Sequence, residues 1–267
     1  ATEPRCRHCG YIGRRAEFAG RLCPRCRRQY NGPPGSPIIG PVTIDDVRKP
    51  DRLAEIMARA KPAWEPGTRQ AYHAISLGFY EAEILRRIDP QHRTLGQFFH
   101  DEIAVPLGLE VYIRLPESIP NERLGPIEPM TLMKRLFGFP LKFALATMDT
   151  NSPMYRALVV NPGSAIVHDE ETIYARNLEV PSGGGVGTAD AIAHAYGEFA
   201  TGGKNIGLKK ETLDLLMAEA TPSANGFYDE CMLAEAQFSL GFAKPSETLL
   251  MPTPSSFGHP GAGGAMG

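Results

Sequence analysis

Four cysteines near the amino terminus form the most regular group of reactive side chains in the sequence. They occur as two Cys-x2-Cys pairs, Cys6 with Cys9 and Cys23 with Cys26, with thirteen residues between the pairs. Both thiolates of such a pair can reach one ion, and two pairs complete the four-sulfur site typical of structural zinc. The spacing predicts one structural zinc ion and indicates no cofactor for catalysis. Two disulfides, or unrelated cysteines in an Arg-rich tail, are the alternatives.

Two further segments could hold polar groups at a binding site. In Trp64-Glu-Pro-Gly-Thr-Arg-Gln-Ala-Tyr72-His-Ala74, a Pro-Gly turn would hold the Tyr72 phenol at the mouth of an apolar helix. Near the other end, Phe257-Gly-His-Pro-Gly-Ala-Gly-Gly264 places His259 among glycines that leave room for a ligand along the backbone. Taken singly, a tyrosine at a helix start is usually a packing residue, and a histidine in such a strand is usually structural or exposed.

Together these segments resemble the second and third motifs of the serine β-lactamase-like hydrolases, a family of class C β-lactamases, related esterases and penicillin-binding proteins. The resemblance continues through Ile84–Pro90, Thr94–Phe99 and Glu102–Gly108. It covers about residues 41–267 and is strongest to the β-lactamase-domain-containing branch. It implies an α+β fold of the β-lactamase/transpeptidase type, mostly the helical domain with an incomplete antiparallel sheet.

The resemblance also implies roles for particular residues. In that family a serine in a Ser-x-x-Lys box transfers an acyl group, while a motif tyrosine handles the proton and backbone amides stabilise the oxyanion. By motif match, Tyr72 would be the proton-relay phenol and His259 the first residue of the third motif. Gly261 and Ala262 would line the oxyanion and substrate subsite. The implied ligand is a small ester or amide.

Two departures from the family pattern bear on activity. Ala74 stands where the family has an amide side chain, and no serine in the chain is followed three residues later by a lysine. Because an unactivated serine is a poor nucleophile, we expect a hydrolase relative that is inactive as this chain. A non-catalytic binding or scaffolding protein that uses the old cleft and a zinc module is the alternative, and a gene-model fragment is another. Strand alternation would turn Ser255 to the same face as His259.

The charge pattern divides the chain into two parts. Residues 1–35 carry eight Arg against two Glu, a net +6, so the other residues carry −8 of the total −2. With the Pro- and Gly-rich run over 31–37, this predicts a small Cys-rich module over 1–35 and a partial β-lactamase-like serine hydrolase domain over 36–267. The sparse aromatic residues among the arginines argue against nucleic-acid binding. A protein partner remains open, and a cytoplasmic or other reducing compartment is favoured.

Hydrophobic periodicity predicts the elements that must position these residues. No run of eighteen apolar residues occurs, which excludes a membrane-spanning helix and predicts a soluble chain. Helices are expected over 51–61, 72–88, 130–137, 188–200 with Thr188 as N-cap, and 210–220. Thr94-Leu-Gly-Gln97 has the form of a capping box before a helix that ends by Pro106. Strand segments are expected over 238–242 and 256–264, and Cys231 is expected to be a small buried hydrophobe.

Overall fold

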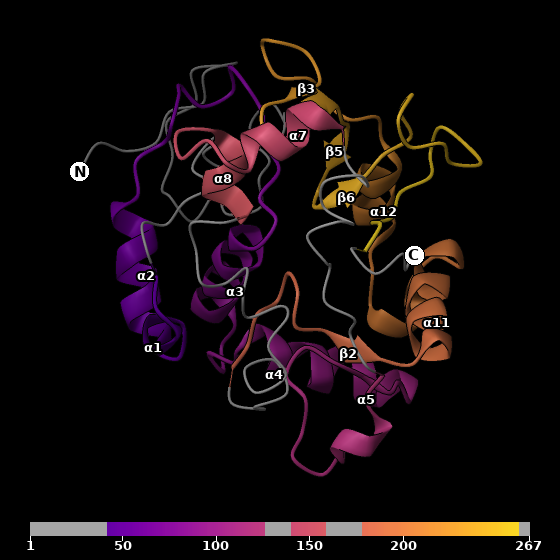
Figure 1. Cartoon of the computed structure of the whole chain (residues 1–267). Coiled ribbons are helices and arrows are strands. Elements are labelled where there is room, and N and C mark those ends of the chain that lie inside the picture. The colour runs from indigo at the N-terminus through magenta and orange to yellow at the C-terminus, as the bar shows by residue number, and fades with distance from the viewer. Residues whose placement is uncertain (1–41, 126–139, 159–177, 262–267) are drawn as a thin grey trace.

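The computed structural model describes residues 42–125, 140–158 and 178–261 (Figure 1). Several sequence predictions lie outside these described residues and stay predictions: Cys6, Cys9, Cys23, Cys26, the linker over 31–37, the helix over 130–137 and Ala262. No helix of the described part is long and apolar enough to cross a membrane.

The amino-terminal described part is helical. A short helix, α1 (Ile44–Val47), leads into α2 (Pro50–Arg59), which begins with proline in its first turn. The buried face of α2, formed by Leu53 and Met57, packs on Phe79 of α3 (Ser76–Ile88) and on Leu178 and Val180. The helix expected over 51–61 is therefore confirmed within two residues at its end.

Helix α3 begins four residues later than the periodicity predicts, at Ser76 rather than Tyr72. The reason lies in tertiary hydrogen bonds, because the Gln70 carbonyl accepts from the Glu230 N–H and the Tyr72 N–H donates to the Asp229 carboxylate. These bonds hold residues 70–72 against the carboxyl-terminal half of the chain in place of a helical turn. Tertiary pairing thus overrides local helix propensity here.

The capping box at Thr94 is present. The Gln97 N–H donates to Thr94 Oγ1 at 3.2 Å, and the Thr94 N–H donates to Gln97 Oε1 at 3.0 Å. This box begins α4 (Leu95–Phe99), which continues through a π-helical turn, η2 (His100–Ala104), into α5 (Val105–Leu107). The helical run ends at Leu107, one residue beyond the predicted end at Pro106.

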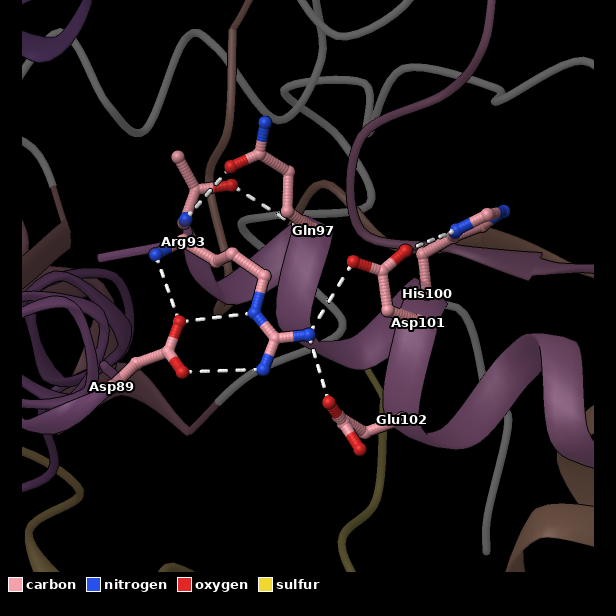
Figure 2. Close-up of polar contacts among 7 residues, drawn as sticks. Asp89, Arg93, Gln97, His100, Asp101 and Glu102 are labelled. Carbon is pink, nitrogen blue, oxygen red and sulfur yellow. Dashed lines mark hydrogen bonds and ion pairs between the residues drawn. The ribbon is translucent and has the colours of Figure 1, made fainter. Parts of the chain in front are cut away.

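A network of charges fixes this helix to the end of α3 (Figure 2). Arg93 forms a two-pronged pair with Asp89, with distances of 2.9 Å from Nε and 3.2 Å from Nη2. Its Nη1 also lies 2.8 Å from a Glu102 carboxylate oxygen and 3.4 Å from one of Asp101. The hydrogen bonds from Arg93 lower the pKa of Asp89 to about 2. All partners in this network thus lie between residues 89 and 102 of the chain.

Further helices follow in the described residues. They are η3 (Asn121–Arg123), α7 (Leu141–Ala146), α8 (Pro153–Leu158), α11 (Ala189–Ala200), η4 (Lys204–Ile206) and α12 (Lys210–Met217). Thr188 caps α11 as predicted, since its Oγ1 accepts from the Ala191 N–H at 3.2 Å. Helix α12 ends three residues before the predicted end because Ala218 is extended. In Figure 1, α11 lies on the opposite side of the molecule from α1 and α2.

The strands of the described part form three two-stranded antiparallel ladders. They are β1 (Val111–Tyr112) with β2 (Val186–Gly187), β3 (Tyr228–Asp229) with β4 (Ala234–Glu235), and β5 (Phe238–Ser239) with β6 (Phe242–Ala243). Helices thus accompany small antiparallel ladders, in agreement with the expected α+β class.

The single strand expected over 238–242 is wrong, because this segment is a hairpin. Leu240 and Gly241, with φ of 49° and 90°, form the turn between β5 and β6. Two left-handed residues match the twist of a tight hairpin. Downstream, Gly258 pairs with Ala243 through hydrogen bonds of 2.7 and 3.2 Å, so the segment that carries His259 runs beside β6.

A buried lysine lies beneath this hairpin. Lys244, 1% exposed, donates from Nζ to the Leu216 carbonyl at the end of α12 at 2.7 Å. The same nitrogen lies 5.4 Å from the centroid of the Phe257 ring. Burial lowers the pKa of Lys244. The ammonium therefore joins α12, β6 and the His259 segment.

Candidate active site

Tyr72 and His259, which are 187 positions apart in the chain, lie together in the structure. The Tyr72 Oη is 3.4 Å from His259 Nε2, and the two ring centroids are 5.9 Å apart with 25° between the ring planes. Both residues are partly buried. The two motif residues expected to face one cleft are thus in direct contact.

A third ring, which the sequence analysis did not identify, completes the group. Phe238 of β5 stacks on Tyr72 at 5.7 Å between centroids and on His259 at 6.4 Å, with 22° and 29° between planes. Aromatic stacking of this kind restricts ring rotation and excludes water from one side of the polar pair. Phe238 therefore forms an apolar wall beside the Tyr72 phenol and the His259 imidazole.

The backbone at the histidine determines which ring nitrogen faces the phenol. His259 Nδ1 lies 2.8 Å from the Pro260 carbonyl oxygen, which can only accept a hydrogen bond. In the neutral imidazole the proton is therefore on Nδ1, and Nε2 is left as an acceptor directed at the Tyr72 hydroxyl. This arrangement allows the phenol to pass its proton to His259 Nε2.

The environment keeps Tyr72 protonated at neutral pH. Burial raises the pKa of the phenol above its ordinary value of 10.0, and Cys231 and Asp229 raise it further. Cys231 is itself fully buried, and burial raises the pKa of its thiol to about 12. The expected small buried hydrophobe at 231 is confirmed, and Tyr72 is a hydrogen-bond donor in this arrangement.

The segment that carries Tyr72 is docked on the β3–β4 ladder. Gln70 Nε2 donates to the carbonyls of Phe227 at 2.7 Å and Ala236 at 2.6 Å. Arg69 pairs with Glu230 at 3.4 Å at the exposed edge of the same contact. The position of the phenol is thus set by residues more than 150 positions away, and no local signal in the sequence identifies them.

The other residues singled out in the sequence are not in direct contact with the Tyr72–His259 pair. Gly261 is exposed at the end of the described residues, beyond His259. Ser255 lies in a turn, where its hydroxyl meets Thr253 Oγ1 at 3.1 Å, and Ser256 meets the same oxygen at 3.0 Å. The expectation that strand alternation sets the direction of Ser255 is wrong, because Ser255 is not part of a strand. His73 contacts Ser76 Oγ from its Nδ1 at 3.0 Å, at the start of α3.

The described residues contain no group of three His, Cys, Asp or Glu side chains placed to hold a metal ion.

Comparison with known proteins places this geometry in a family. A sequence model of the Beta-lactamase family matches residues 36–267. The esterase/β-lactamase LipL of Mycobacterium tuberculosis (strain ATCC 25618 / H37Rv) is 27% identical over 219 residues, which are 80% of this chain and 48% of that protein. The chain thus spans about half the length of the curated relative it matches.

Solved structures agree with that match. The crystal structure of a family VIII carboxylesterase has a TM-score of 0.68 and 26% identity, covering 94% of this chain and 60% of that one. A penicillin-binding protein homolog from Caulobacter crescentus has a TM-score of 0.66 and 23% identity, covering 91% of this chain and 58% of the other. The latter likeness shows the fold alone. The family match over 36–267 shows that this chain belongs to the β-lactamase family.

Proposed function

We propose that this chain forms the Tyr72–His259 side of an acyl-hydrolase cleft for small esters or amides and transfers no acyl group by itself. The observation that carries the proposal is the 3.4 Å contact between Tyr72 Oη and His259 Nε2 in a chain that has no Ser-x-x-Lys sequence. The names of the relatives, a family VIII carboxylesterase and an esterase/β-lactamase, support an ester or amide as the ligand.

The chemistry of the Tyr72–His259 pair allows proton transfer but does not by itself supply acyl transfer. A phenol whose hydroxyl is directed at an imidazole nitrogen can pass its proton to that nitrogen and take the same proton back. Covalent acyl transfer also needs a hydroxyl whose proton is removed by an adjacent base, and Ser255 and Ser256 instead contact the Thr253 hydroxyl. The pair can therefore move a proton beside a bound ligand without forming an acyl-serine.

Covalent labelling tests the absence of acyl transfer. The full chain is incubated with p-nitrophenyl acetate and, separately, with a fluorophosphonate, and it is followed by absorbance and by intact mass. We expect no burst of nitrophenol and no stoichiometric adduct. An adduct on a serine that is lost when that serine is changed to alanine would show an active enzyme and overturn this half of the proposal.

A binding experiment tests the other half of the proposal, that the Tyr72–His259 pair lines a cleft for a small ester or amide. Addition of p-nitroacetanilide, the amide analogue of the same ester, should shift the ring proton signals of Tyr72 and His259, assigned with Tyr72→Phe and His259→Gln. The Phe238→Ala variant should weaken that binding because it removes the apolar wall. Ring signals that stay unchanged at millimolar ligand would contradict a binding cleft at this place.

The cysteine spacing supports a second candidate, a binding or scaffolding protein with a zinc module. Four thiolates from Cys6, Cys9, Cys23 and Cys26 would hold one ion. Elemental analysis of the full chain should then find about one zinc per chain, and Cys6→Ala should reduce this content. Zinc-free protein with two disulfides would rule out the module.

A further inference from the structure

We propose that Asp229 is the positioning residue of the Tyr72–His259 pair, and that its buried carboxylate ties the backbone of Tyr72 to the turn after β3. The contact itself is independent of turnover. Its importance for a ligand rests on the function proposed above.

The carboxylate collects three backbone donors on a single oxygen. Asp229 Oδ1 accepts from the N–H of Tyr72 at 3.1 Å, of Cys231 at 2.9 Å and of Met232 at 2.8 Å. The bonds from 231 and 232 close the turn that follows β3, whereas the bond from Tyr72 comes from 157 positions earlier in the chain. The Asp229 residue is 1% exposed. One buried side chain therefore joins the turn and the tyrosine.

The hydrogen bond from the Tyr72 N–H to Asp229 fixes the backbone position that carries the phenol. The backbone two residues earlier is held as well, because Gln70 pairs with Asp229 in a parallel bridge and its carbonyl accepts from the Glu230 N–H at 3.0 Å. With the backbone fixed on both sides of Ala71, the Tyr72 ring retains only its own side-chain torsions. Stacking on Phe238 and His259 restricts those torsions to the orientation that meets His259 Nε2.

The chemistry of the side chain is suited to this role. An aspartate or an asparagine can place an oxygen at this position, whereas an alanine cannot. Burial raises the pKa of Asp229 and the three backbone hydrogen bonds oppose that rise. The ionisable groups that face it are the Tyr72 phenol, the Cys231 thiol and the Glu230 carboxylate. Burial raises the pKa of the Tyr72 phenol and of the Cys231 thiol, so both stay protonated while the Asp229 carboxylate ionises.

A pH titration of the backbone amides tests the contact in the unaltered chain. In 15N-labelled full-length protein, the amide signals of Tyr72, Cys231 and Met232 should shift together in one transition, with a midpoint above the ordinary carboxyl value of 3.8. Asp229→Asn should abolish this common transition. Glu230→Gln, which removes the neighbouring carboxylate that pairs with Arg69, is the matched control and should retain it.

A second measurement tests the effect on the phenol. The nuclear Overhauser effect between the Tyr72 and His259 rings should persist in Asp229→Asn, which keeps an acceptor oxygen, and disappear in Asp229→Ala. Exchange of the Tyr72 amide proton should become roughly tenfold faster in the alanine variant, as expected for loss of one buried hydrogen bond. Circular dichroism establishes that the variants are folded. If the alanine variant does not fold, the titration of the unaltered chain decides.

Two results would overturn the proposal. One is a Tyr72 amide that does not follow the ionisation of Asp229 in the unaltered chain. The other is a folded Asp229→Ala variant that keeps both the ring contact and the slow amide exchange. Neither measurement involves turnover or ligand, so the proposal can stand or fall separately from the labelling and binding tests of the function.

Discussion

The start of α4 and the Tyr72 site are both held by polar contacts, but the contacts differ in range. Around Thr94, the hydrogen bonds and ion pairs join residues 89–102, so the partners are neighbours in the chain. Around Tyr72, the partners are Asp229, Phe238 and His259, more than 150 positions away. Local contacts stabilise a helix wherever that helix lies, whereas the site exists only after the two ends of the described fold meet.

The largest effect should come from removing the acceptor that joins the distant parts. Asp229→Ala leaves the buried N–H of Cys231 and the partly buried N–H groups of Tyr72 and Met232 without their acceptor, at a desolvation cost of roughly 1–3 kcal/mol for a fully buried group. We expect the free energy of unfolding in urea to fall by about 3–4 kcal/mol. Glu230→Gln, which breaks an exposed ion pair only, should change it by less than about 0.5 kcal/mol. Equal losses of unfolding free energy in the two variants would show that the Asp229 hydrogen bonds stabilise the fold no more than the exposed ion pair does.

The next effect concerns Lys244, which holds the His259 segment to α12. Its pKa in the folded chain lies below 10.5. As pH rises through that lowered pKa, the folded lysine loses its proton while the unfolded one keeps it. The free energy of unfolding should therefore increase with pH in this window, by up to about 1.4 kcal/mol per pH unit, and level off near 10.5. Urea titrations between pH 7 and 10.5 measure this slope.

A matched variant isolates the contribution of the lysine. Lys244→Met has a similar length and no titrating nitrogen, so its stability should lack that pH-dependent increase. If the methionine variant shows the same slope as the unaltered chain, the ionisation responsible lies elsewhere.

The smallest change in stability is expected at the N-cap of α4, where the contacts are local in the chain. Thr94→Ala removes the N-cap oxygen of α4 and should cost about 1 kcal/mol in urea unfolding. Thr94→Ser keeps the oxygen and should restore most of that loss. The ring contact between Tyr72 and His259 should be unchanged in both variants, and its loss in Thr94→Ala would show that the two regions are coupled.

The same difference in range explains what the sequence could predict. The capping box at Thr94, the N-cap at Thr188 and helix α2 depend on residues three or four positions apart, and all three are confirmed. Tyr72 and His259 came from a resemblance to family motifs and not from periodicity. Phe238 and Asp229 had no signal, because their significance depends on partners in another part of the chain.

Two of the differences in secondary structure are informative about their causes. The start of α3 was placed four residues early because tertiary bonds from Gln70 and Tyr72 compete with the helix. The hairpin at 238–243 was interpreted as one strand because Leu240-Gly241 lacks the Asn-Gly or Asp-Gly sequence typical of such turns. In both cases local sequence preference gave way to contacts made elsewhere.

The long chain separation between Tyr72 and His259 also has a consequence for the order of folding. Closing a loop of this length costs conformational entropy before contacts between its two ends can offset that cost. Helices α2 and α4, in contrast, can form from neighbouring residues. During synthesis, Tyr72 is made 187 residues before His259, so the phenol cannot meet the imidazole until that later segment has been made. Pulse-labelling hydrogen exchange during refolding should therefore find the α4 amides protected before the amide of Tyr72.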